Sequence, residues 1–282
     1  AEQGNNADRE GIGMGFVKDM VPWEGGKISS RVHCLRANNP SPMTYVGTNT
    51  YIVAEPTSPE CIVIDPAPSG QHVKDIVDYC VNEGLRVGAI VLSHCHADHT
   101  EGAAELQSMT AAEIFAPFDS TLLEGTFEPI ENGPSFEVIA LPGHSSDSVG
   151  LYYAADNSIF IGDIAFRYGP TVVYYPDGVL RDYMESLDKL EALVKKHNIQ
   201  VMLPGHGYPI TDPVACLEAS RAHRLERLQQ IKDALANGVP RDAEALVDAI
   251  YVDTDPKLKS VAIKSVKAQL LYLDDEEEKK DQ

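Results

Sequence analysis

Ser93-His94-Cys95-His96-Ala97-Asp98-His99 places three imidazoles and one carboxylate directly after the apolar run 90–92. On an extended chain the side chains of His94 and His96 point to the same side, and a turn into the next helix brings Asp98 and His99 to a neighbouring volume. Imidazole nitrogen and carboxylate oxygen are the ligands expected for zinc, at roughly 2.0 to 2.2 Å, and an open position would hold water. The stretch therefore predicts two adjacent metal positions.

Three more residues of the ligand type follow apolar, strand-like runs. His144 comes after residues 138–143, Asp163 after residues 159–162 and His206 after residues 201–205. Buried strands that deliver side chains to one edge of a sheet are how a rigid site with several ligands is built. The predicted metal ligands are therefore His94, His96, Asp98, His99, His144, Asp163 and His206.

Asp65 also ends an apolar run, residues 62–64. We expect its carboxylate to accept a hydrogen bond from a ligand histidine and so to fix the tautomer of that ring. Cys95 lies between two predicted ligands but should point to the opposite side of the strand, so we do not expect a nucleophilic thiol there. The remaining histidines stand alone on strand or helix patterns and are predicted to be structural or at the surface: His33, His72, His197 and His223.

The composition is that of a globular protein with a strongly acidic balance. The chain has 282 residues, 43% hydrophobic and 23% charged, which favours one large domain or two unequal ones and excludes disordered and collagen-like classes. The formal charge of −20 opposes attraction to a phosphate backbone. No apolar run approaches the roughly 18 residues of a membrane span, so we expect no membrane insertion. Five cysteines without CxxC spacing indicate free thiols and a cytoplasmic protein.

The pattern changes twice along the chain. Residues 1–27 hold six glycines and no apolar period, and we interpret them as an N-terminal extension. Over residues 28–212 short strand-like runs alternate with helical patterns, among them a helix over residues 180–197, which predicts an α/β domain. Residues 213–282 are predicted to form a small helical module, with helices over residues 214–236, 243–251 and 257–273. A solvated acidic run, residues 274–278, is expected at its end.

The motif of residues 94–99 resembles the HxHxDH signature of the metallo-β-lactamase superfamily, and the later ligands of that family are matched by His144, Asp163 and His206. The resemblance covers roughly residues 28–212 and implies a four-layer αββα sandwich with the metals at one edge. It assigns a first zinc to His94, His96 and His144. It assigns a second to Asp98, His99 and His206, with Asp163 bridging the two ions.

Other segments are similar to the lactamase-beta-2-like branch of this superfamily. They are NPSPMTYVGTNTY at residues 39–51, YMESL at residues 183–187 and LPGHG at residues 203–207. The helical end, with His223-Arg224 and Ile250-Tyr251, is similar to a truncated form of the winged-helix segment of that branch. The chain departs from the branch at Ser41, where glycine is usual, and in the acidic tail, where a β-hairpin wing would follow.

The resemblance implies a hydrolase with two zinc ions per chain. A water that bridges two Zn²⁺ ions has a pKa of about 7, so hydroxide is available as a nucleophile near neutral pH. It would attack a carbonyl carbon or a phosphorus, and the second metal or a protonated Asp98 would stabilise the leaving group, which makes Asp98 a candidate catalytic residue. The same hydroxide can attack esters, thioesters, lactones, amides and phosphodiesters, so the substrate class stays open.

Competing functions differ in the charge that they need. Our first interpretation is a hydrolase for a small or single-stranded substrate. The second is a thioester hydrolase resembling glyoxalase II, which would need a basic pocket. The third is a nucleic-acid-binding module with structural metals. The branch includes a single-strand-selective endoribonuclease. A basic helix stripe is formed by Arg221, Arg224, Arg227 and Lys232. Because acidic residues interrupt it, we interpret it as a solvated face and expect weak RNA binding and a small-molecule substrate.

Overall fold

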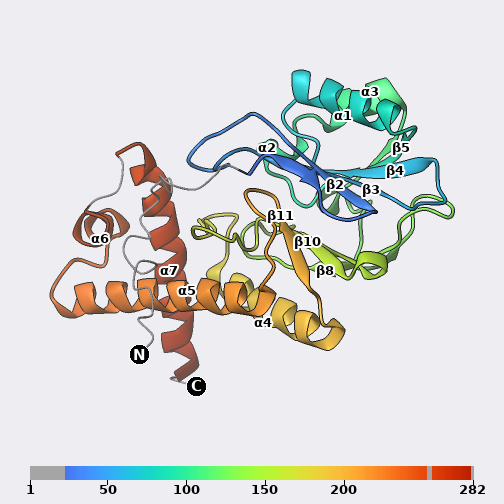
Figure 1. Cartoon of the computed structure of the whole chain (residues 1–282). Helices are drawn as coiled ribbons and strands as arrows, with labels where there is room; N and C mark the ends of the chain where they lie inside the picture. Colours follow the sequence, from blue (N-terminus) through green and yellow to red (C-terminus); the bar gives the residue numbers. More distant parts are fainter. Residues whose placement is uncertain (1–22, 253–255, 281–282) are drawn as a thin grey trace, which may run out of the picture.

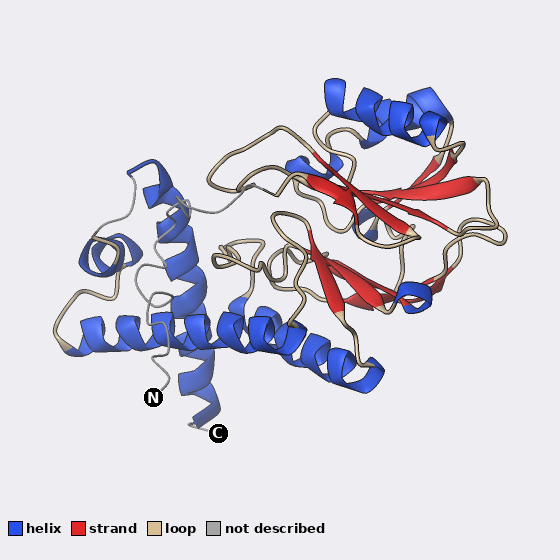
Figure 2. Ribbon diagram, viewed as in Figure 1, coloured by secondary structure: helices blue, strands red, loops and turns tan. Residues whose placement is uncertain are grey.

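The structure is a computed structural model of the whole chain and describes residues 23–252 and 256–280. Two mixed β-sheets stack face to face, with helices on their outer faces (Figure 2). The first sheet has the order β1 (Gly25–Lys27), β2 (Val32–Arg36), β3 (Asn49–Ala54), β4 (Glu60–Ile64), β5 (Arg86–Val91), β6 (Glu113–Phe115). The second has the order β11 (Val201–Pro204), β10 (Ser158–Gly162), β9 (Val149–Tyr153), β8 (Phe136–Ala140), β7 (Gly125–Phe127).

Helices complete the four layers on either side of the sheets. Figure 1 shows α1 (Gln71–Asn82) and α3 (Ala103–Thr110) over the first sheet and α4 (Leu180–His197) beneath the second. The short α2 (Ala97–Thr100) follows β5, and single turns of 3₁₀ helix lie at Pro117–Asp119 and Ala154–Asp156. The predicted α/β class, a four-layer sandwich followed by a helical module, is confirmed.

The core follows from strict alternation along the strands. Tyr51 and Val53 of β3 face the second sheet, whereas Ile52 between them faces the layer of α1 and α3. In β10, Phe160 faces the first sheet while Ile159 faces α4. Because side chains alternate with period two and each sheet has a layer on both sides, β3 and β10 are buried on both faces, which is why these runs read as continuously apolar.

The C-terminal module consists of α5 (Pro213–Ala236), α6 (Ala243–Ile250), a 3₁₀ turn at Pro256–Leu258 and α7 (Lys259–Lys280). Its buried side chains, such as Leu228 and Leu246, belong to the same apolar cluster as Leu187 of α4. The module is thus packed onto the outer helix layer of the sandwich. In the described part of the chain, no helix has the length and apolarity needed to cross a membrane.

The structure differs from the predictions at the boundary of the N-terminal extension and in the conformation of the acidic run. The stretch assigned to the N-terminal extension contributes β1, which pairs antiparallel with β2; three residues are too few to show an apolar period. The rest of that extension, residues 1–22, lies outside the described residues. The acidic run 274–278 is largely exposed, as expected, but it is helical and belongs to α7, where Arg181 pairs with Asp275 and Glu276 and Arg241 pairs with Asp274.

Candidate metal centre

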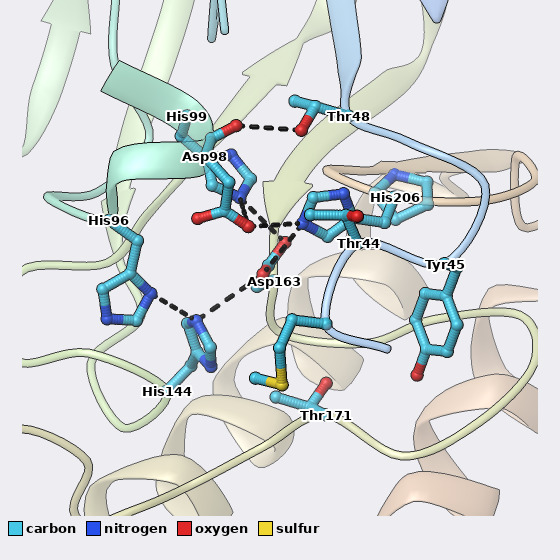
Figure 3. A network of polar contacts seen from close by, with 12 residues as sticks. Thr44, Tyr45, Thr48, His96, Asp98, His99, His144, Asp163, Thr171 and His206 are labelled. Carbon is cyan, nitrogen blue, oxygen red and sulfur yellow. Dashed lines mark hydrogen bonds and ion pairs between the residues drawn. The ribbon is translucent and has the colours of Figure 1, made fainter. Parts of the chain in front are cut away.

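All seven predicted ligands lie at one edge of the sandwich, where β5, β10 and β11 end. They form two groups, and within each group one ligand atom per residue lies within 4.8 Å of the others. The groups are His94, His96, His144, and Asp98, His99, Asp163, His206. Figure 3 shows that side chains of both groups converge on the Asp163 carboxylate. Its Oδ2 lies 3.6 Å from Nε2 of His144 and 3.4 Å from Nε2 of His206, so this carboxylate stands between the two groups.

The loop after β5 is bent where we expected an extended chain. Residues 93–95 form a bend, and His96 precedes the first turn of α2. The rings of His94 and His96 still meet, with Nε2 of His94 3.1 Å from Nδ1 of His96. The bend also carries Cys95 toward His96 and Asp177 rather than to an opposite strand face. Burial, Asp147 and Asp177 raise the pKa of the Cys95 thiol to about 11, which disfavours the nucleophilic thiolate.

Asp65 joins two ligand histidines. It stands at the end of β4 with φ of 54°, a left-handed conformation that aspartate tolerates better than most residues. Its Oδ2 accepts hydrogen bonds from Nδ1 of His99 (2.9 Å) and from the Ser93 hydroxyl (2.7 Å), and its Oδ1 accepts from the Ser93 amide (2.8 Å). Ser93 Oγ in turn accepts from Nδ1 of His94 at 2.9 Å. One carboxylate thereby orients the Nε2 atoms of both His94 and His99.

The other ligand rings are held by backbone oxygens. His144 donates from Nδ1 to the carbonyl of Val172 at 2.7 Å, and Nδ1 of His206 lies 3.3 Å from the carbonyl of Gly47. His96 is the exception: its Nδ1 faces His94 and His144, and its Nε2 lies 3.7 Å from Oδ2 of Asp177. Sequence reasoning missed Asp177, since no apolar run precedes it.

Gly205 is a further residue that the sequence analysis did not single out. A Cβ at this position would lie 2.5 Å from Oδ1 of Asp163 and 2.5 Å from Cε1 of His99. The Gly205 amide donates to the carbonyl of Gly162 at 2.8 Å, which ties the ends of β10 and β11 together. Only glycine fits there, because any side chain would displace two predicted ligands. Its place directly before His206 is the signal that could have found it.

Charges at the site are strongly coupled. Burial lowers the pKa values of His94 and His144. Burial acts the same way on His206, but Asp163 and Asp98 outweigh it and raise the pKa of that ring to about 9. Burial raises the pKa of Asp163, yet His206 and His99 outweigh it and hold the pKa well below its usual range.

Three buried polar atoms of the site make no hydrogen bond and only ion-pair contacts of 3.3 to 3.9 Å: Nε2 of His99, Nε2 of His206 and Oδ1 of Asp163. Leaving such atoms unsatisfied costs about 1 to 3 kcal/mol each, so their convergence on one volume indicates a ligand there. Nitrogen and carboxylate donors in this number fit two divalent metal ions.

The remaining histidines belong to neither ligand group. His33 stacks on Tyr79, Nε2 of His72 lies 2.7 Å from the Thr50 hydroxyl, and His197 packs on Tyr152. His223 lines a separate pocket beside Arg224. The segment 39–51 supports the metal edge instead, since the Thr48 hydroxyl donates to the carbonyl of Asp98 at 2.9 Å.

Comparison with known proteins agrees with this geometry. The sequence profile of the metallo-beta-lactamase superfamily matches residues 43–117 and 109–206, more than half of the chain. A beta-lactamase-like protein 2 homolog of Caenorhabditis elegans is 26% identical over 261 residues, covering 88% of this chain and 85% of that protein. An atrochrysone carboxyl ACP thioesterase of Cryptosporiopsis sp. is 29% identical over 217 residues, covering 74% of this chain and 64% of that enzyme.

A solved structure shows the same fold. The crystal structure of a beta-lactamase domain protein from Burkholderia ambifaria has a TM-score of 0.72 to this chain at 20% identity, and the match covers 91% of this chain and 90% of that one. The agreement extends beyond the sandwich, because 91% coverage must include much of the helical module. The chain therefore belongs to the metallo-beta-lactamase superfamily, in the branch of beta-lactamase-like protein 2, and is a metal-dependent hydrolase.

Proposed function

We propose that the seven side chains hold two zinc ions and that the protein hydrolyses the thioester of a small acyl compound. The observation that carries the dinuclear site is the position of Asp163. Its Oδ2 faces His144 of one ligand group and His206 of the other, while its Oδ1 is buried without a hydrogen-bond partner. The Asp163 carboxylate would therefore serve as a ligand to both ions.

The choice of a thioester rests on the relatives and on the surroundings of the site. Relatives that align with this chain include enzymes named acyl-carrier-protein thioesterases. Aromatic side chains border the ligands: the Phe166 ring lies 5.9 Å from His206 and 5.2 Å from Tyr45, and Tyr174 stacks at 6.5 Å on His96. Such a border suits an apolar acyl chain better than a phosphodiester backbone.

Residues of this chain would bind the ions, orient the ligand rings and accept a proton. Two zinc ions, when bound, would polarise the thioester carbonyl and activate a water molecule. Asp65 fixes the rings of His94 and His99, so the ligand set needs little rearrangement during the reaction. Asp98 is the more exposed carboxylate, and its Oδ2 faces His206 at 3.3 Å. Because His206 and His99 outweigh burial and lower its pKa, Asp98 is ionised at neutral pH and would act as the proton acceptor for the water.

The basic stripe on α5 does not favour an RNA substrate. Arg224 is only 6% exposed, which contradicts our interpretation of the stripe as a solvated face. Arg221 forms ion pairs with Asp188 and Glu191 of α4, and the guanidinium of Arg227 stacks on the Tyr251 ring at 4.8 Å. These arginines serve contacts within the protein, so they leave no open basic face for several phosphates.

Metal content and a substrate panel test the proposal. Elemental analysis of zinc-loaded protein should give two ions per chain. Hydrolysis of acyl-N-acetylcysteamine thioesters should be faster than hydrolysis of the matching oxygen ester, a lactone or single-stranded RNA. His96→Ala should lose metal and activity together, whereas His33→Ala, which removes a histidine stacked on Tyr79, should keep both.

Two results would overturn the proposed function. A stoichiometry below one after reconstitution with excess zinc would contradict the dinuclear site. A higher kcat/KM for single-stranded RNA than for every thioester would contradict the substrate class.

A further inference from the structure

A pocket of about 120 Å³ lies beside the metal centre, between the loop 166–171 and helices α4 and α5. Phe166 forms one wall, and because its ring lies 5.9 Å from that of His206, the pocket and the metal centre share this side chain. Exposed residues at its edge, Arg167, Gly169 and Ala219, open it to solvent. The volume is enough for a carboxylate or phosphate group, given about 30 Å³ for one water.

The polar floor of this pocket is Arg224. Its side chain is buried, and its guanidinium lies over the Tyr183 ring at 5.3 Å. One terminal nitrogen donates to the carbonyl of Thr171, while Nε has no hydrogen-bond partner. Thr171 and Tyr183 both donate from their hydroxyls to the carbonyl of Ile164, at 3.0 and 2.8 Å, so the pocket is joined rigidly to the residue that follows Asp163.

The charge of Arg224 is not balanced by the protein. Within residues 23–252 and 256–280, no carboxylate forms an ion pair with it, although Arg221, one turn earlier, pairs with two. The described residues that line the pocket include Arg167, His223 and Arg224 but no aspartate or glutamate, in a chain of net charge −20. Buried charges are normally paired, because removing an ion from water is costly.

We propose that this pocket binds an oxyanion group of the substrate, a carboxylate or a phosphate, with Arg224 as its buried partner. The inference rests on the proposed function, since the group bound would belong to the thioester that reaches the metal centre past Phe166. Guanidinium groups suit oxyanions because their planar N–H donors match two oxygens at once. The basic pocket that a thioesterase for an acidic substrate requires is therefore supplied by α5 and the loop 166–171.

Binding of free anions tests the pocket without catalysis. Inorganic phosphate and malonate would be titrated into the zinc-loaded protein by calorimetry, and the imidazole resonances of His223 would be followed by NMR. Arg224→Gln should weaken binding by about 10- to 100-fold and abolish the shift of His223, as expected when a charge-assisted hydrogen bond is lost. Arg227→Gln is the matched control: it removes a guanidinium that also stacks on a tyrosine, outside the pocket, and should change nothing.

Two further controls keep the result interpretable. Anion bound only at the metals would be insensitive to Arg224→Gln and would leave His223 unmoved, and this outcome would overturn the proposal. Because removing a buried arginine can destabilise the fold, Ala219→Phe is the second variant; it blocks the exposed edge of the pocket, leaves Arg224 in place, and should weaken binding in the same way.

Substrates then identify the source of the oxyanion. Acetyl-N-acetylcysteamine carries no oxyanion, succinyl-N-acetylcysteamine carries a carboxylate on the acyl side, and acetyl-coenzyme A carries phosphates on the thiol side. One charged substrate should have a KM at least about 10-fold below that of the neutral one, and Arg224→Gln should abolish this difference. Equal KM values for all three in the wild type would overturn the proposal. If no thioester is cleaved but phosphate or malonate binding depends on Arg224, the proposed function fails while the anion pocket stands.

Discussion

The metal-centre edge and the C-terminal helical module use polar side chains in opposite ways. At the edge, polar atoms of His99, His206 and Asp163 are buried and lack hydrogen-bond partners. In the module, Arg241 forms half-exposed ion pairs with Asp274 and Glu277 of α7, and most buried side chains are apolar, such as Leu246. Burial without a partner lowers stability, so several such atoms around one volume indicate that a ligand completes the site. Two residues of the described module share this feature singly: Nε of Arg224 and Oε1 of Gln269 are buried without a hydrogen-bond partner.

The largest effect should come from Asp163→Ala. This change removes the carboxylate between the two ligand groups and leaves buried imidazoles facing each other. Metal content should fall below two per chain, and kcat/KM should drop by more than the about 10- to 100-fold that losses of ligand-orienting residues cause. Elemental analysis and steady-state kinetics measure both. The exposed Asp188→Ala should keep metal and rate; if Asp163→Ala does so too, the contrast between the two regions is wrong.

A core truncation in the module should affect stability and spare the metals. Leu246 is fully buried in the apolar cluster shared with α4, so Leu246→Ala should lower the free energy of unfolding by about 2 to 5 kcal/mol. Denaturant unfolding measures this loss, and metal stoichiometry of the folded variant should stay at the wild-type value. Leu225→Ala, at a half-exposed position of α5, is the control and should change stability by less than about 0.5 kcal/mol.

Asp65→Asn changes a residue that orients two predicted ligand rings but is not itself a predicted metal ligand. Asparagine tolerates the positive φ at this position, so the change tests the charge and not the backbone. It replaces an acceptor for His99 and Ser93 with an amide, and zinc affinity should fall by about 10- to 100-fold with metal still bound at saturation. A competition assay with a chelator gives the affinity. Asp75→Asn, at an exposed position of α1, should match the wild type; equal affinities for all three proteins would refute the orienting role.

The smallest effect is expected at the rim of the module. Arg241→Ala removes an exposed ion pair with Asp274 of α7, and such pairs contribute about 0 to 1 kcal/mol. The midpoint of denaturant unfolding should shift slightly, and less at high salt, because exposed charges are screened. A loss near that of Leu246→Ala would mean that the module, like the metal edge, depends on its charges.

The sequence by itself identified the seven candidate ligands and most of the elements. The spacing of residues 94–99 and the apolar runs before His144, Asp163 and His206 locate ligands at strand ends, because period-two runs mark buried strands. The helix expected over residues 180–197 is α4, with the same bounds. Such features are local: residues a few positions apart in the chain fix them, so a single sequence contains the signal.

Only the tertiary structure decided which nitrogen of each ring faces the candidate metal site, why position 205 must be glycine, and that Arg224 is buried. The carbonyls that orient His144 and His206 belong to Val172 and Gly47, 28 and 159 positions away. Every residue has a backbone carbonyl, so the residue type at a position does not predict this contact. Arg224 shows the same limit, because periodicity gives the face of a helix but not what packs on it. The loop 166–171 and α4 cover that face, so Arg224 lies at the floor of a pocket and not on a solvated stripe.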